Sequence, residues 1–474
     1  MALEGRFPVK KSRITPIERS RFFITKGEGD LGETIDFQLI CTEAENFRKN
    51  KQYAEALPLF KQVWESGWQQ GRERTGWRYA FCLRKLGRSA EALEICREVY
   101  KLKPEMDQNC SLYAWCIFDT ALKIDNSTIK ENEQDFFKAA NAILKLTPET
   151  STFSPTASTV FKIIDYLIEA RVNYPALQIL EWLDKLDPEK LSKEYRSGPG
   201  KDGKQVEYAS DEEKWYSEKA KALDKLEKYQ ESKLVSLKAL ETLKIFHYDN
   251  EIWFNYRVAV ADKHLGLLDE AQALLEKVRQ RKKDYFIDLE LAEVAYAQSR
   301  LNDAIKFACS AALAPGQTDL GFRWKVYFLL AQLFKEKGEL ALAKEHALLV
   351  WKIRTEQEWK VPAEVESLTK DLAVNLSDQR SARKIEKGLQ EAWKKARFED
   401  RRKICGQIKT VLNDGKSGFI IGEDGKEYYY HSRELRGDRD LYDYGIEVVF
   451  YCEPAIEKGK KDSAIEIHRL DEQD

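Results

Sequence analysis

In each of six stretches of this chain, two small residues lie twelve positions apart. In the first stretch, Phe47 and Phe60 follow the two small residues by three and four positions. Two helices can pack closely only where small side chains meet, and larger apolar residues one turn away then fill the flanks. The spacing therefore predicts a series of antiparallel helical hairpins. The six pairs are Ala44 and Ala56, Ala80 and Ala92, Ala220 and Ser232, Ala259 and Ala271, Ala292 and Ala304, and Ala331 and Ala343.

Turn signals fall between and after these helices. Glycine follows the first helix of three units, in KLGR (85–88), HLGL (264–267) and EKGE (336–339), where it can cap the helix. Pro104 and Pro188 are expected to end second helices, because proline cannot continue the hydrogen-bond ladder. The spacing from Ala56 to Ala92 is 36 residues, which suits a short stacked repeat.

These features resemble the tetratricopeptide repeat, over residues 39–355. Two weaker units, 111–148 and 157–188, fill the gap between the clear ones. The resemblance implies an all-α solenoid, a right-handed superhelix of about eight hairpins, whose concave face would hold a protein partner. The polar insertion 190–212 contains Gly198-Pro199-Gly200 and is expected to form a protruding loop. Residues 1–38 are assigned to an N-terminal extension.

A polar helical segment, 356–403, follows the repeats and is expected to cap them or link them to the next domain. Its last part is the most basic stretch of the chain, with a net charge of +6 over 380–403. Beyond it, residues 404–474 change to short alternating apolar runs separated by Gly and Asp turns: CGQIKTVL, SGFIIGEDGKEYYYH, GIEVVFYCEP and SAIEIHRL. Such runs are typical of strands and predict a small five-stranded β-barrel.

The C-terminal segment resembles a cold-shock domain, which is an OB-fold. The opening GQIK (406–409), SGFI (417–420), the Asp424-Gly425 turn and YYYH (428–431) match the family's pattern in order. The family binds single-stranded nucleic acid by stacking bases on aromatic side chains. Thr410 and Ser417 stand where the family has two of these aromatics.

The resemblance implies a nucleic-acid-binding face on the second and third strands. Alternation places Phe419, Tyr429 and His431 on one face, with Lys409 beside them, and turns Tyr428 and Tyr430 into the barrel. Residues 404–474 have ten basic and sixteen acidic side chains, so the positive charge that phosphates require must come from elsewhere. The basic segment is the expected source, through Lys394, Lys395, Arg397, Arg401 and Arg402.

Composition narrows the remaining possibilities. Lys and Arg (78) nearly balance Asp and Glu (80), so no overall field attracts nucleic acid or membrane. The eight cysteines form no CxxC pair and are expected to be reduced thiols in a cytoplasmic protein. The N-terminus has no apolar signal-peptide core, and no apolar run is long enough to span a membrane.

The sequence shows no catalytic constellation. The five histidines are scattered, without HExxH or Cys–His ligand spacing, so we expect no enzyme activity, no cofactor and no metal. Gly415-Lys416-Ser417 lacks the first glycine of a phosphate-binding loop, since Thr410 occupies that position, and is expected to be a turn.

Three functions remain open. The first is a non-catalytic adaptor that binds single-stranded nucleic acid, RNA in preference to DNA, through the barrel and basic helix, and a protein through the repeats. The second is a pure protein-interaction scaffold whose barrel face only docks or is covered. The third is a regulatory component of a stress or anti-phage system, an analogy with other repeat proteins. The oligomeric state is not predicted.

Overall fold

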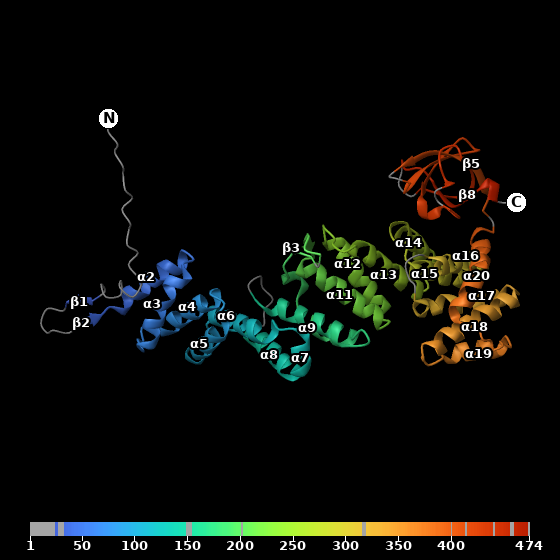
Figure 1. The fold of residues 1–474 in the computed structure, drawn as a ribbon. Helices are drawn as coiled ribbons and strands as arrows, with labels where there is room; N and C mark the ends of the chain where they lie inside the picture. Colours follow the sequence, from blue (N-terminus) through green and yellow to red (C-terminus); the bar gives the residue numbers. More distant parts are fainter. Residues whose placement is uncertain are drawn as a thin grey trace, which may run out of the picture. The chain divides into compact units, whose positions relative to one another are not determined.

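The computed structural model describes residues 24–26, 33–147, 154–200, 202–314, 319–399, 401–412, 415–438, 441–455 and 459–472. The chain divides into two compact units, Met1–Asn250 and Glu251–Asp474 (Figure 1). Of the predicted N-terminal extension, residues 1–23 and 27–32 lie outside the described residues. Ile24–Lys26 (β1) and Glu33–Ile35 (β2) pair antiparallel, and the first described helix begins at Phe37.

The first unit consists mainly of helices that pack against their neighbours in sequence, α2 on α3, α4 on α5 and α11 on α12. The weaker predicted unit 111–148 is less regular than the others, because its first helix continues into a π-helical turn. The helical segments are α2 Phe37–Lys49, α3 Tyr53–Glu65, α4 Arg72–Lys85, α5 Ser89–Leu102, α6 Asp107–Ile117, the π-turn η2 Phe118–Leu122, α7 Asn126–Glu131, α8 Glu133–Leu146, α9 Thr156–Ala170, α10 Ala176–Leu183, η3 Pro188–Lys190, α11 Asp211–Lys225 and α12 Tyr229–Thr242.

The insertion at 190–212, expected to be a loop, contains a β-hairpin. Arg196–Pro199 (β3) and Gln205–Tyr208 (β4) pair antiparallel, and Ser210 then caps α11. Pro188, expected to end a second helix, instead opens η3, five residues after α10 has ended at Leu183.

The second unit continues the hairpins and ends in the barrel. Its helices are α13 Asn250–His264, α14 Leu268–Arg281, α15 Tyr285–Ala297, α16 Leu301–Leu313, η4 Leu320–Arg323, α17 Trp324–Glu336, α18 Leu340–Glu356, α19 Ala363–Asp371 and α20 Ala382–Phe398. Its strands are β5 Lys403–Leu412, β6 Ser417–Gly422, β7 Glu427–His431, β8 Glu447–Glu453 and β9 Ser463–Arg469, with short helical turns η5 Ser432–Glu434 and η7 Leu470–Glu472.

The predicted hairpin frame is confirmed in all six units. Every one of the twelve small residues is fully buried. Ser232 replaces alanine in one pair, and its hydroxyl is satisfied there by the carbonyl of Ala220 at 3.1 Å. Small side chains thus occupy the contact between the two helices of each hairpin, as close helix packing requires.

In all six hairpins, the residue seven positions after the first small residue has a left-handed backbone conformation. Three of these residues are glycines, among them Gly87 with φ of 79°. In the other three hairpins a side chain adopts the same conformation: Lys51, Glu227 and Ser299 have φ of 58–60°. The residue that follows donates its N–H back to the last turn of the first helix, as from Lys228 to the Leu223 carbonyl at 3.0 Å. The turn is a helix C-cap that favours glycine but is not restricted to it.

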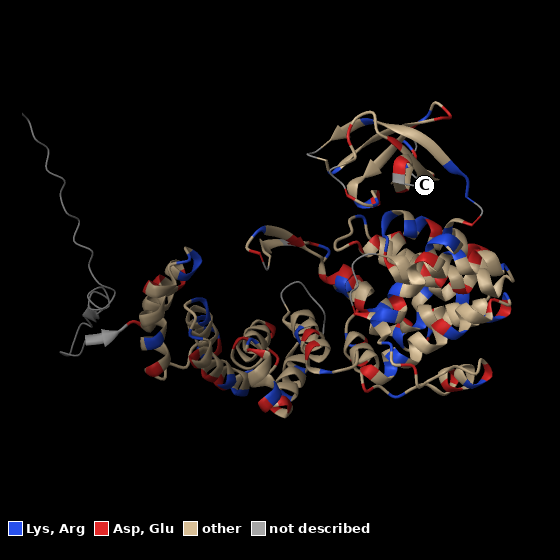
Figure 2. Cartoon of the chain, turned by 45° about the vertical axis from the view of Figure 1, so that its right-hand side comes forward, with Lys and Arg blue, Asp and Glu red and all other residues tan. Residues whose placement is uncertain are grey.

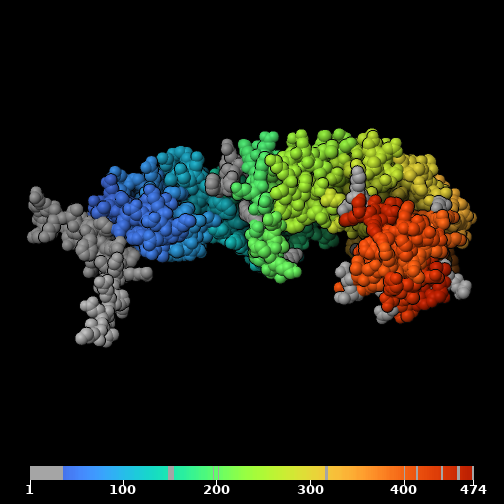
Figure 3. Space-filling model, turned by 90° about the horizontal axis from the view of Figure 1, so that it is seen from above, coloured from blue at the N-terminus to red at the C-terminus, as the bar shows by residue number. Residues whose placement is uncertain are grey.

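The five C-terminal strands close into a barrel in the order β5-β6-β7-β9-β8. Its core contains Ile408, Ile420, Val448 and Phe450, together with Tyr428 and Tyr430, which confirms that both tyrosines point inward. Gly418 permits the tight contact of β5 with β6, because a Cβ there would lie 2.1 Å from the Thr410 carbonyl oxygen. In Figure 3 the C-terminal residues, coloured orange to red, form one rounded body. The strand set therefore has the architecture of an OB-fold.

The basic helix ends earlier than predicted. α20 stops at Phe398, and Lys403 already begins β5, so Arg401 and Arg402 lie in the connection between helix and barrel. One side of α20 is buried in the core of the repeats through Ile385, Leu389 and Trp393. The helix is therefore an integral part of the repeat core, and its charged side chains are exposed or half-buried.

Candidate nucleic-acid interface

Two aromatic side chains lie side by side on the outer surface of the barrel. Phe419 of β6 and Tyr429 of β7 are directly paired across the strands. Their ring centroids are 5.8 Å apart and the rings meet edge to face. Tyr429 keeps 37% of its surface exposed and Phe419 is half-buried. The pair offers a ring surface on which a nucleobase can stack.

Two lysines and one carboxylate surround this aromatic pair. Lys409 lies at an irregularity in the β5–β6 pairing, between Ile408 and Thr410. Its ammonium group forms an ion pair with Glu427, and Lys461 forms an ion pair with the same carboxylate. The Lys461 ammonium also lies 5.4 Å from the centroid of the Phe419 ring. Two cations sharing one anion leave the face with a local charge of about +1, which favours phosphate weakly.

Sequence reasoning missed Glu427 and Lys461. Strand alternation alone would have placed Glu427 on the face, since it precedes Tyr429 and His431 by two and four residues. Lys461 lies just before β9, far along the chain from Phe419, and no local pattern indicates that they meet. Both residues nevertheless belong to the surroundings of the aromatic pair.

His431 extends the same face toward the end of β7. It is exposed and pairs across the strands with Ser417, which is buried. Its Nδ1 accepts the backbone N–H of Arg433 at 3.2 Å, which fixes the ring at the strand end. The aromatic face therefore comprises Phe419, Tyr429 and His431, while Ser417 and Thr410 add no ring.

The predicted basic residues are distributed over α20 and the connection that follows it. Lys394 forms an ion pair with Glu391 at 2.8 Å and lies 4.0 Å from Glu466 of β9. Lys395 is exposed in the last turn of the helix, and Arg397 lies over the Phe398 ring at 4.9 Å. Of these three side chains, Lys394 approaches the barrel directly, through Glu466.

Phe398 joins the helix to the barrel. Its ring stacks on that of Tyr451 in β8, with centroids 4.2 Å apart and planes at 7°. Lys283, after α14, forms a second link to β8 through Glu453 at 3.2 Å. Burial lowers the pKa of Arg401, and the nearby positive charge of Arg397 lowers it further. A cation that lies beside another cation favours an anionic partner.

Arg401 and Arg402 line a cavity of about 570 Å³ at one end of the barrel. The predicted residues thus form two groups. Lys409, Phe419, Tyr429 and His431 are brought together on the strand face, whereas the five basic residues belong to the helix end and the barrel-end cavity.

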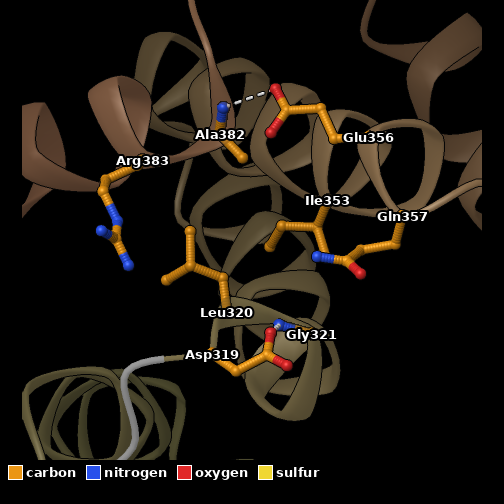
Figure 4. Close-up of a pocket in the computed structure, with 8 residues that line it drawn as sticks. All are labelled: Asp319, Leu320, Gly321, Ile353, Glu356, Gln357, Ala382 and Arg383. Carbon is orange, nitrogen blue, oxygen red and sulfur yellow. Dashed lines mark hydrogen bonds between the residues drawn. The ribbon is translucent and has the colours of Figure 1, made fainter.

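The repeats carry cavities of their own. One, of about 490 Å³, is lined by residues of α15, α17 and α19, including Tyr296, Phe328 and Leu368. Another, of about 370 Å³, lies between η4, α18 and α20 (Figure 4). There Glu356 accepts the backbone N–H of Ala382 at 2.9 Å and so caps the start of α20. The second cavity is thus part of how the basic helix is anchored.

The described residues contain no cluster of three or more His, Cys, Asp or Glu side chains suited to hold a metal ion. No helix in the described ranges combines the length and the apolar character needed to cross a membrane.

A family described as a domain of unknown function (DUF7017) matches residues 252–396, which run from α13 through most of α20 and stop before the barrel. No curated protein matches the chain in sequence.

Solved structures with helical repeats align over much of the chain at low similarity. PilF of Pseudomonas aeruginosa is 11% identical over 63% of this chain and 97% of its own, with a TM-score of 0.26. A tetratricopeptide repeat protein from Parabacteroides merdae is 10% identical over 71% and 98%, with a TM-score of 0.27. The C-terminal part of a tetratricopeptide repeat protein from Cytophaga hutchinsonii is 13% identical over 70% and 99%, with a TM-score of 0.29. The fold is therefore assigned from this chain alone. Its helical hairpins form a tetratricopeptide-like solenoid, and its five C-terminal strands form a closed barrel.

Proposed function

We propose that the protein is a non-catalytic adaptor that binds single-stranded nucleic acid, RNA in preference to DNA, on its C-terminal barrel and a protein partner on its repeats. The observation that supports the first part best is the juxtaposition of Phe419 and Tyr429, with Lys461 and Lys409 beside them. Rings stack on any base, and the lysines supply charge for the backbone, so binding would depend little on sequence at this face.

The repeats favour a protein partner because their grooves mix apolar and charged side chains. The cavity between α15, α17 and α19 exposes Tyr296 and Phe328 beside Glu336 and Asp371. Acidic and basic residues are interspersed along the repeat helices (Figure 2). A surface of this kind offers apolar contacts and hydrogen bonds together, which is typical of peptide and protein recognition.

The nucleic-acid part is tested by fluorescence anisotropy of labelled single strands with the full chain. Phe419→Ala combined with Tyr429→Ala should weaken binding by about 30-fold or more, because each base–aromatic stack contributes roughly 1–3 kcal/mol. Tyr444→Ala is the matched control, since Tyr444 belongs to the same barrel and is 76% exposed. Equal affinity of the double variant and the wild type, or tighter binding of DNA than of RNA, would contradict the proposal.

A pure protein-interaction scaffold is the second candidate. It is favoured by Glu427, whose carboxylate is shared by both lysines of the face and partly cancels their charge. In that case single strands do not bind at physiological salt, and protein partners captured by the full chain survive nuclease treatment.

A further inference from the structure

The barrel-end cavity and the aromatic face are formed in part by neighbouring residues of the same two segments. Tyr428 lines the cavity while its neighbour Tyr429 belongs to the face, and Asp462 lines the cavity while its neighbour Lys461 lies over Phe419. The backbone N–H of Tyr429 donates to the Asp462 carbonyl at 2.8 Å, which joins β7 to the segment that contains Lys461 and Asp462. A strand on the face and a nucleotide in the cavity would therefore contact adjacent residues of the same two segments.

The cavity has the size of a small-ligand site and a balanced charge. At about 570 Å³ it falls within the range of pockets that enclose small organic groups. Its lining includes three cations, Arg401, Arg402 and Lys426, and three carboxylates, Glu423, Asp424 and Asp462. A simple anion would meet repulsion as well as attraction here. A ligand with an anionic end for the cations and a hydrogen-bond-donating end for the carboxylates fits this lining.

Most of these charges already have partners. Arg402 forms an ion pair with Glu423 at 3.0 Å, and Asp424 accepts the Tyr428 hydroxyl at 2.6 Å. Asp462 uses one oxygen, Oδ1, to accept the Ala455 N–H at 2.6 Å.

Two groups retain capacity for a ligand. The Asp462 Oδ2 atom meets only the Cys452 thiol, a weak donor, at 3.8 Å among the described residues. Arg401 makes no ion pair within the described ranges and lies over the Phe398 ring, 5.8 Å from its centroid. The cavity thus presents one available guanidinium and one available carboxylate oxygen.

We propose that this cavity binds one nucleotide of the bound strand, with its phosphate on Arg401 and an exocyclic amino group of its base donating to Asp462 Oδ2. The proposal rests on the proposed nucleic-acid function and adds a base preference to it. Cytosine offers an amino donor at the position where uracil has a carbonyl acceptor. The site therefore selects cytosine over uracil, since a carbonyl oxygen facing a carboxylate is repelled.

The test compares oligo(C) and oligo(U) of equal length by fluorescence anisotropy with the full chain. Wild type should bind oligo(C) about 10-fold more tightly, the value expected of one hydrogen bond to a charged acceptor. Asp462→Asn keeps an oxygen for Ala455 and puts an amide donor in place of Oδ2, so the preference should vanish or reverse. Glu447→Gln, the same change at an exposed position of β8, should leave it intact.

Arg401→Gln gives an independent readout. It should weaken both oligomers equally and lower the slope of log affinity against log salt by about one. If neither oligomer binds wild type, the proposed function itself fails. If both bind with equal affinity, or if Asp462→Asn keeps the cytosine preference, the cavity assignment is overturned and the stacking face remains.

Discussion

Acid should weaken the attachment of α20 to the repeats through one buried histidine. His346 of α18 is completely buried and stacks on Phe334. The Trp393 Nε1–H of α20 donates to His346 Nε2 at 2.7 Å, so the Nδ1 must carry the proton that is donated to the Leu342 carbonyl at 2.7 Å. Both ring nitrogens are thus used by the neutral imidazole. A second proton on Nε2 would face the indole N–H and break this bond.

The size of the effect follows from the pKa of His346. Burial lowers this pKa from 6.5 to about 4. As the pH falls from 7, the unfolded chain takes up this proton near pH 6.5, before the folded chain does. The free energy of unfolding is therefore highest above pH 6.5 and decreases as the pH falls toward 4. By pH 5 the loss amounts to about 2 kcal/mol of unfolding free energy, and the full loss is about 3 kcal/mol.

The assay is denaturant unfolding at pH 7 and pH 5, followed by circular dichroism, for wild type and His346→Gln. The variant should lose about 2 kcal/mol less than wild type over this interval, because it has no imidazole to protonate. His264→Gln, which removes an exposed histidine of α13, is the control and should behave like wild type. Titration of the histidine resonances by NMR supplies a direct check. A His346 pKa near 6.5 in the folded protein, or an unchanged pH dependence in His346→Gln, would refute the reasoning.

Three further changes test the packing of the chain. Gly418→Ala should unfold the barrel while leaving the helices, seen as loss of dispersed strand resonances, because its Cβ would overlap the Thr410 carbonyl. A helical circular dichroism signal that falls together with those resonances would instead mean that barrel and repeats unfold as one. Glu227→Gly should raise the unfolding free energy by about 1 kcal/mol, since φ of 58° strains a side chain; no gain in the denaturation midpoint would contradict this. Trp393→Ala should cost about 3–5 kcal/mol by opening a cavity in the repeat core; a midpoint equal to that of wild type would show that α20 is not part of that core.

The local pattern of the sequence was sufficient to predict the two architectures. Small residues twelve positions apart determine where two helices can approach, and alternating apolar runs determine which strand residues enter the barrel. Both are short-range constraints, so the hairpins, the inward Tyr428 and Tyr430 and the outward Phe419 and Tyr429 could be predicted without any knowledge of tertiary contacts.

Helix ends and insertions were harder to predict. The basic segment reads as helix up to residue 403, yet β5 takes over at Lys403 because its backbone pairs with Tyr451 of β8. Likewise, the 190–212 insertion is polar and glycine-containing, and only the pairing of Gly198 with Val206 shows it to be a hairpin. Strand pairing depends on a partner elsewhere in the chain, and a local pattern does not contain it.

The site depends most on contacts that are distant in sequence. The basic composition of 380–403 indicated a helix available to phosphate, but the structure buries Trp393 of that helix and ties Lys394 to carboxylates. Charge can be counted along the chain, whereas its availability depends on which anions the fold brings near it. The linear pattern of residues is enough to predict a helical-repeat array with a C-terminal barrel and an aromatic face. The position of Lys461 over Phe419, the sharing of Glu427 between two lysines and the cavity at the barrel end follow from the folded chain alone, because these groups meet only when β9 closes the barrel.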